Sequence, residues 1–202
     1  MRNQSENQIE KASIVLIRHG ETGSNRERRY LGRTDEPLSP EGRNKLLAFR
    51  EEGRYPKAEL VFSSPMRRCL ETAKLLYPEK EILVIPGWEE IDFGLFEGKT
   101  YEELKDRPDY VRWLESGGTL SFPEGESREQ FIRRSVSGFF AMMEQVRGKT
   151  AVAVVHGGTI MAVLSRLSGG DYFDYQVANG GGYRFLVSLK EKKCEITETE
   201  KL

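Results

Sequence analysis

The chain has 202 residues, and its 31 lysines and arginines nearly balance its 32 aspartates and glutamates, so the formal charge is −1. A charge this close to neutral excludes a protein that binds nucleic acid over a generally basic surface. Hydrophobic residues make up 38% of the chain, which is enough to bury a core and excludes a disordered chain.

The N-terminal segment and the cysteines predict a cytoplasmic protein. Residues 1–11 are polar and lack the apolar segment of a secretory signal. No apolar run reaches the roughly 18 residues that span a bilayer. Cys69 and Cys194 form neither a disulfide framework nor the spacing of a metal site. We therefore expect a reduced protein of the cytoplasm, with a polar tail over residues 1–11 and one domain over residues 12–202.

In the first half of the chain, short apolar runs alternate with helical patterns. Strands are predicted at residues 13–17, 60–62 and 81–85, and a polar loop at residues 21–35. Ser39-Pro40 and Ser64-Pro65 each combine an N-cap residue with proline at the first helical position. These pairs predict one helix that ends near Gly53 and a second that runs through about Leu76.

The second half continues the alternation after a loop over residues 87–98. Short helices are expected at 101–105 and 109–115, a strand at 150–155, a helix from 157 to about 167, and late strands at 183–189 and 194–197. Ser127 and Gln130 form a capping box before a helix with apolar residues spaced by four and three, namely Ile132, Val136, Phe139, Met143 and Val146. The whole pattern predicts a single α/β domain with a mostly parallel sheet and helices on both faces.

The chain has two histidines, and both follow a predicted buried strand and precede glycine. Ligands of open α/β sheets bind at the carboxyl ends of the strands, where His19 and His156 both lie. Glycine lets backbone approach a ligand closely, and Gly157-Gly158 leads into a helix N-terminus. One such histidine is ordinarily a satisfied polar group at a strand end. Two of them with arginine nearby favour a functional site.

Five segments of the chain resemble the histidine phosphatase superfamily, also called the phosphoglycerate-mutase-like family. They occur in the family's order between about residues 14 and 165, and comprise LIRHGET at 16–22 with Asn25, GRTDEPLS at 32–39 with Gly42, FSSPMRRC at 62–69 with Thr72-Ala73, EIDFG at 90–94 with FEG at 96–98, and VHGG at 155–158. The resemblance implies a phosphoglycerate-mutase-like three-layer sandwich and chemistry on a phosphate monoester.

The resemblance also implies a role for each matching residue. His19 would attack phosphorus, because an imidazole with a pKa of roughly 6.5 has a neutral nitrogen at physiological pH. Arg18 and Arg68 would clamp the phosphoryl oxygens, since guanidinium donors match that geometry. Glu90 would donate and later accept a proton. The expected catalytic residues are His19, Glu90, His156, Arg18 and Arg68, and the expected phosphate ligands are Arg18, Asn25, Arg68, His156 and Gly157.

The neighbouring charged residues are expected to have no such role. Arg67 would lie on a solvated helix face and Glu89 would face solvent. The loop arginines either line the mouth of the site or are simply solvated, and no role is assigned to Arg26, Arg28, Arg29 or Arg33. No metal or other cofactor is expected, because the two histidines lack zinc-site spacing and the arginines can meet the phosphate charge.

Three functions fit the resemblance: a phosphatase, a cofactor-dependent mutase, and a non-catalytic phosphate-binding module. The presence of all the matching chemical residues disfavours the third. Mutases of the family carry an arginine and a tyrosine after the catalytic glutamate, whereas Glu90 is followed here by Ile91-Asp92-Phe93-Gly94, and the extra basic segment of mutases is missing. Water should then reach the phosphohistidine, so hydrolysis is predicted.

The substrate is predicted only as a small phosphomonoester, with no nucleic-acid or membrane partner. Compact members of the family resemble α-ribazole-5′-phosphate phosphatases and broad-specificity phosphatases, which makes α-ribazole phosphate one candidate. Four aromatic residues could form a stacking wall for a substrate or belong to the core, namely Phe93, Phe96, Trp113 and Phe122. The oligomeric state and the role of residues 172–183 stay open.

Overall fold

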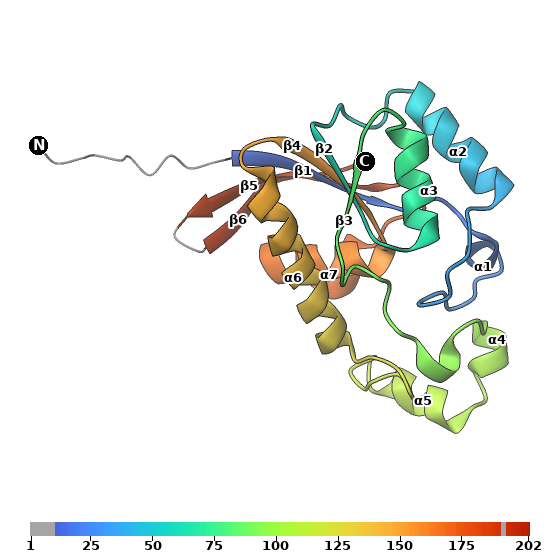
Figure 1. Ribbon diagram of the computed structural model, residues 1–202. Helices are drawn as coiled ribbons and strands as arrows, with labels where there is room; N and C mark the ends of the chain where they lie inside the picture. Colours follow the sequence, from blue (N-terminus) through green and yellow to red (C-terminus); the bar gives the residue numbers. More distant parts are fainter. Residues whose placement is uncertain (1–10, 191–192) are drawn as a thin grey trace, which may run out of the picture.

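A six-stranded sheet forms the centre of the protein (Figure 1), whose computed structural model describes residues 11–190 and 193–202. The strand order is β3-β2-β4-β1-β5-β6, with bounds β1 Lys11–Arg18, β2 Leu60–Ser63, β3 Ile82–Val84, β4 Thr150–Val155, β5 Gly182–Lys190 and β6 Lys193–Lys201. Strands β1 to β4 are parallel, and β5 and β6 add antiparallel pairs at one edge. The predicted mostly parallel α/β fold is confirmed. The predicted tail over residues 1–11 lies outside the described residues, except Lys11, which begins β1.

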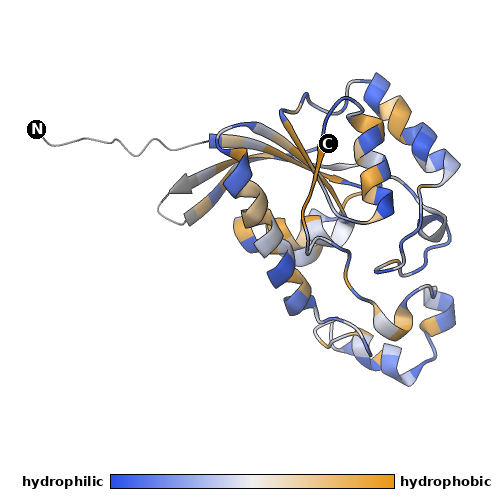
Figure 2. Ribbon diagram, in the orientation of Figure 1, coloured by the Kyte–Doolittle hydropathy of each residue, from blue (hydrophilic) through white to orange (hydrophobic). Residues whose placement is uncertain are grey.

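Helices cover both faces of the sheet, as predicted. Helices α2 (Pro40–Glu51) and α3 (Arg67–Leu76) pack on one face, and α6 (Arg128–Val146) and α7 (Gly157–Ser168) on the other (Figure 1). Alternate residues of a strand point to opposite faces, so Val15 and Ile17 pack under α2 and α3, while Ile14 and Leu16 pack under α6 and α7. Figure 2 shows the resulting apolar strands at the centre of the molecule.

The buried stripe of α6 differs from the predicted one in its first half. Phe139, Met143 and Val146 are buried as predicted, whereas Ile132 and Val136 are half-buried. The first half instead buries Phe131, Ser135 and Gly138. The reason is Trp88, whose indole N–H donates to the Ser135 carbonyl (3.0 Å) and lies so close that a Cβ on Gly138 would be 2.4 Å from its Nε1. Because the indole packs this closely on Ser135 and Gly138, this side of the first half of α6 is the buried one.

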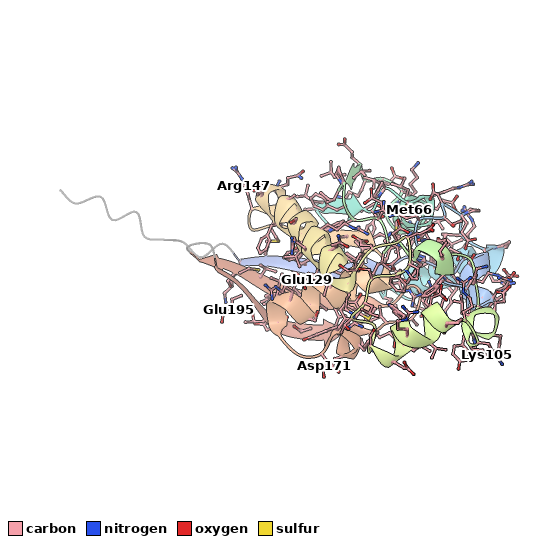
Figure 3. All side chains as sticks on the ribbon, turned by 90° about the horizontal axis from the view of Figure 1, so that it is seen from below. Met66, Lys105, Glu129, Arg147, Asp171 and Glu195 are labelled. Atoms are coloured by element: carbon pink, nitrogen blue, oxygen red, sulfur yellow. The ribbon has the colours of Figure 1, made fainter. Side chains whose placement is uncertain are left out.

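Helix α3 begins two residues later than the serine-proline signal predicted. Its N-cap is Met66, labelled in Figure 3, and Ser64 caps no helix. The Ser64 hydroxyl lies 2.8 Å from His156 Nε2 and accepts the Met66 N–H at 3.3 Å. The serine forms part of a turn that contacts a histidine from another strand, a contact that the local sequence does not reveal.

A small cap between β3 and α6 lies apart from the sheet, below α1 (Gly23–Arg26) in Figure 1. It contains the 3₁₀ turn η1 (Gly94–Phe96) and the short helices α4 (Tyr101–Leu104) and α5 (Pro108–Glu115). The cap has its own apolar cluster, with Phe96, Leu104 and Tyr110 buried, and it joins the main domain through Phe131 and Ala162. A second 3₁₀ turn, η2 (Tyr172–Tyr175), precedes β5. Across the described residues, no helix combines the length and apolarity needed to cross a membrane.

Candidate active site

The two histidines meet because they follow neighbouring parallel strands. Arg18 of β1 pairs with Val155 of β4, so the next residues of both strands, His19 and His156, emerge side by side. Their rings are 5.3 Å apart between centroids at an angle of 67°. Both side chains are buried. The predicted convergence at the carboxyl edge of the sheet is therefore present in the fold.

Among the described residues, His19 uses one ring nitrogen for a hydrogen bond and leaves the other without a partner. Its Nδ1 lies 2.7 Å from the Gly20 carbonyl oxygen; a carbonyl only accepts, so Nδ1 carries the proton and Nε2 holds a lone pair. Burial lowers the pKa of His19 well below 6.5, and the positive charges of Arg68 and Arg18 lower it further. The ring is therefore neutral at physiological pH, with an unprotonated nitrogen available to attack.

The charges of two guanidinium groups act on this ring, one from the half-buried Arg18 and one from the buried Arg68. Arg18 donates to the Val177 carbonyl (2.8 Å). Arg68, completely buried, donates to the carbonyls of Thr34 and Gly32 (both 2.8 Å). Within the described part of the chain, the Nε of each arginine is buried without a hydrogen-bond partner. Buried donors are ordinarily satisfied, so these two N–H groups are suited to receive the oxygens of an anion.

Glu97 holds the loop that supports Arg68. Its Oε1 accepts the amides of Gly32 (2.8 Å) and Thr34 (3.0 Å), the same residues whose carbonyls bind the guanidinium. A Cβ on Gly32 would lie 2.1 Å from the Ile91 carbonyl oxygen, so the loop packs too closely for any side chain there. The sequence placed Glu97 in a matching segment without giving it a role, and only its contacts reveal one.

Glu90 is a buried carboxyl that lines the same cavities as Arg18. Its two carboxyl oxygens accept the amides of Ile91 (3.0 Å) and Gly158 (3.4 Å). Burial raises its pKa above the usual 4.5, although these backbone bonds and both arginines act in the opposite direction. A raised pKa favours a protonated carboxyl that can donate. Glu89, in contrast, is partly exposed and lies 3.8 Å from Arg134.

Asn25 and Gly157 line two different cavities that share Arg18 in their walls. Asn25 completes a capping box at the start of α1. Its backbone N–H donates to Thr22 Oγ1 (3.2 Å), and its side-chain Oδ1 accepts the backbone N–H of Thr22 (3.3 Å). Gly157 begins α7, and a Cβ there would be 3.4 Å from Arg18 Nε. The N-terminal end of this twelve-residue helix therefore lies beside Arg18, and its amide groups favour negative charge.

Two cavities adjoin at Arg18 and Glu90. One, of about 500 Å³, is mainly polar and includes His19 and Asn25; the other, of about 420 Å³, is mainly apolar and runs under the cap. Both are lined by Arg18, Tyr30, Glu90, Phe93 and Gln176. Of the four aromatic residues left open by the sequence, Phe96 is core. Phe93, Trp113 and Phe122 line the apolar cavity, where Trp113 stacks on Phe122 at 4.8 Å.

The loop arginines behave differently from one another. Arg26 pairs with Glu21 and Glu41, and Arg29 with Glu27 and Glu103, both at the surface. Arg28 and Arg29 line the polar cavity, whereas Arg33 is exposed and outside it. Arg67 forms an exposed ion pair with Glu71 at 2.8 Å.

Comparison with known proteins agrees with this geometry. The family profile of the histidine phosphatase superfamily (branch 1) matches residues 14–196. The protein named uncharacterized phosphatase PhoE of Bacillus subtilis is 31% identical over 165 residues, which cover 79% of each chain. A mutant phosphoserine phosphatase of Entamoeba histolytica, solved with phosphoserine, is 28% identical with a TM-score of 0.77, and the match covers 93% of this chain and 96% of that one. The α-ribazole phosphatase of Shigella flexneri shares the fold at 24% identity and a TM-score of 0.77, over 92% and 94% of the chains.

The chain therefore belongs to the histidine phosphatase superfamily, branch 1. It is a phosphoric monoester hydrolase. The phosphatase prediction made from the sequence is confirmed at this level.

Proposed function

We propose that this enzyme hydrolyses a small phosphorylated metabolite without a metal ion, through a phosphohistidine formed on His19. One observation carries the proposal: the neutral His19 ring, with its Nε2 unprotonated, feels the charges of Arg18 and Arg68, whose buried Nε groups have no partner in the described residues. Phosphoryl transfer depends mainly on positioning and on stabilising charge over the equatorial oxygens. Both requirements are met by the residues around this nitrogen.

The reaction runs in two displacements. In the first, His19 Nε2 forms a bond to phosphorus, the ester P–O bond breaks, and the protonated Glu90 gives its proton to the leaving oxygen. In the second, water forms a bond to phosphorus while the Glu90 carboxylate takes its proton, the P–N bond to His19 Nε2 breaks, and inorganic phosphate leaves. Arg18, Arg68, Asn25, His156 and the Gly157 amide bind the phosphoryl oxygens in both steps.

The leaving group is proposed to carry an aromatic or other apolar part. The apolar cavity opens on Glu90 and is lined by six aromatic side chains, Tyr30, Phe93, Trp113, Phe122, Tyr172 and Phe173. Aromatic rings prefer stacked and edge-to-face partners. The benzimidazole of α-ribazole-5′-phosphate has that character. Phosphoserine, bound by a relative in its solved structure, is the second candidate, but its charged leaving group suits this lining less well.

The experiment that tests the proposal is hydrolysis of p-nitrophenyl phosphate by purified enzyme with and without EDTA. We expect full activity in EDTA, because Arg18 and Arg68 can take the charge that a metal would otherwise meet. Re-addition of Mg²⁺, Mn²⁺ or Zn²⁺ to the chelated enzyme should add nothing. Activity that is lost in EDTA and restored by one of these ions would overturn the metal-independent mechanism.

A substrate panel in the same assay distinguishes the two leaving-group classes. α-Ribazole phosphate and 1-naphthyl phosphate should exceed phosphoserine and 3-phosphoglycerate in kcat/KM. The preference should fall in Trp113→Ala, which removes a wall of the apolar cavity, and persist in Tyr101→Ala, an exposed cap residue outside that lining. Higher kcat/KM for phosphoserine would contradict the aromatic class.

The buried histidines make stability depend on pH. In the folded enzyme the pKa values of His19 and His156 lie well below 6.5, whereas in the unfolded chain both are ordinary. The unfolded state therefore binds more protons as pH falls below 6.5, and the free energy of unfolding drops by about 1.4 kcal/mol per histidine at one pH unit below that value. Glu90, whose folded pKa is raised, acts in the opposite direction as it takes up its proton.

Chemical denaturation at pH 7.5 and 5.5 measures this effect. We expect the loss of stability on acidification to be largest in Glu90→Gln, where the opposing group is removed. Adding His156→Gln to that variant should roughly halve the loss. A pH dependence unaffected by His156→Gln would show that this histidine is not held neutral.

A further inference from the structure

Asn179 lies where the loop before β5 meets the end of β1. The two segments are joined by backbone hydrogen bonds, in which the Gly180 amide donates to the Arg18 carbonyl (3.0 Å) and the Arg18 amide donates to the Gly181 carbonyl (2.9 Å). The Asn179 side chain lines the polar cavity beside His19 and Asn25. Asn179 belongs to residues 172–183, whose role is open from sequence alone.

The side-chain nitrogen Nδ2 of Asn179 lies within hydrogen-bond distance of three acceptors around His19. It donates to Asn25 Oδ1 at 3.0 Å, to the His19 carbonyl at 3.1 Å, and more weakly to the Gly20 carbonyl at 3.4 Å. The Gly20 carbonyl is the group that accepts His19 Nδ1–H and fixes the tautomer of the ring. One side chain thus contacts both the backbone that orients the nucleophile and a residue of the phosphate site.

The contact with Asn25 decides which end of its amide can serve the substrate. Asn25 Oδ1 accepts from both Asn179 Nδ2 and the Thr22 amide. Because two donors already bind Asn25 Oδ1, the NH₂ group of Asn25 is the end that remains for a ligand. An anion accepts hydrogen bonds, so it requires this donor end. The reversed amide would present oxygen lone pairs to phosphate and would oppose binding.

We propose that Asn179 is a positioning residue that fixes the amide orientation of Asn25 and steadies the His19–Gly20 backbone for phosphoryl transfer. The inference rests on the proposed function, because it matters only if the site binds a phosphoryl group. Asn179 acts through Asn25 and His19 and is not itself assigned a contact with substrate.

The decisive variant is Asn179→Asp, which keeps the shape and removes the donors. The introduced carboxylate would face three acceptors and would draw the NH₂ end of Asn25 toward itself. We expect kcat/KM at pH 7.5 to fall by about 10- to 100-fold, the range for losing hydrogen bonds that orient a charged ligand. Gln176→Glu is the matched control, because it adds a carboxylate to the same cavity lining. Within the described part of the chain, the side-chain bonds of Asn25 go to Thr22 and Asn179 and not to Gln176.

A pH profile separates orientation from charge repulsion. A protonated carboxyl carries an O–H that can again donate to Asn25 Oδ1. Relative to wild type, Asn179→Asp should therefore recover activity as pH falls from 7.5 toward 4.5, and by clearly more than Gln176→Glu does. Equal recovery in the two variants would assign the loss to charge alone and would overturn the inference.

Asn179→Ala and a double-mutant cycle keep the test decisive if the aspartate variant fails to fold. If Asn179 acts largely through Asn25, the double variant with Asn25→Ala should lose much less than the product of the two single losses. Multiplicative losses would overturn the inference. Wild-type phosphohistidine is measured in parallel: its absence would reject the proposed function, whereas its presence with unchanged kcat/KM in Asn179→Ala would reject only the role of Asn179.

Discussion

Replacing His19 by alanine should abolish turnover, with kcat falling on the order of 10⁴-fold or more, as expected when a covalent nucleophile is removed. The reason is that the free Nε2 of His19 is the proposed attacking atom, and alanine leaves no group that could carry the phosphoryl intermediate. Steady-state hydrolysis of p-nitrophenyl phosphate at a fixed pH measures the loss. Circular dichroism and thermal denaturation establish that the variant is folded.

Trapping of the intermediate gives an independent check. Wild-type enzyme quenched during turnover of ³²P-labelled substrate should carry label that is stable to base and lost in acid, as expected of a phosphoramidate. His19→Ala should carry none. Arg67→Ala is the matched control, because Arg67 lies next to Arg68 in sequence but its side chain, within the described residues, pairs with Glu71 alone at the surface. Its activity should stay near wild type. Retained turnover in His19→Ala, or the same label in that variant, would contradict the assignment.

The second large effect is expected in Glu90→Gln, and it should depend on the leaving group. An alkoxide needs a proton as the P–O bond breaks, whereas p-nitrophenolate is stable without one. Leaving-group release should therefore slow by about 10²- to 10³-fold for an alkyl phosphate, within the usual range for general acid catalysis, and by less than about 10-fold for p-nitrophenyl phosphate.

Single-turnover kinetics are needed for this comparison, because Glu90 is also the proposed base in the second step. The first turnover isolates the release of the leaving group from hydrolysis of the phosphohistidine, which is common to both substrates. Glu89→Gln is the matched control, since Glu89 is partly exposed and lies near Arg134. Equal slowing of both substrates in the first turnover would assign the proton to another group.

Much of the fold was predictable from local sequence. Apolar runs, capping residues and helix-start prolines predicted the strands and most helices, because hydrophobic periodicity and terminal hydrogen bonding are properties of neighbouring residues. The Ser127–Gln130 capping box is present. The start of α3 and the buried face of the first half of α6 were wrong, since each depends on a distant partner: His156 at Ser64 and Trp88 at Gly138.

Some properties of the candidate site likewise follow from local sequence, and others depend on tertiary contacts. The sequence by itself determined the residue types and the strand ends that carry them, so His19, Arg18 and His156 were identifiable from motif and position. Only the tertiary structure decided the tautomer of His19, the burial that raises the pKa of Glu90, and the supporting contacts of Glu97 and Asn179. Those properties arise from groups separated by up to 160 residues in the chain. Protonation state and amide orientation depend on such three-dimensional neighbours, and a linear pattern does not record them.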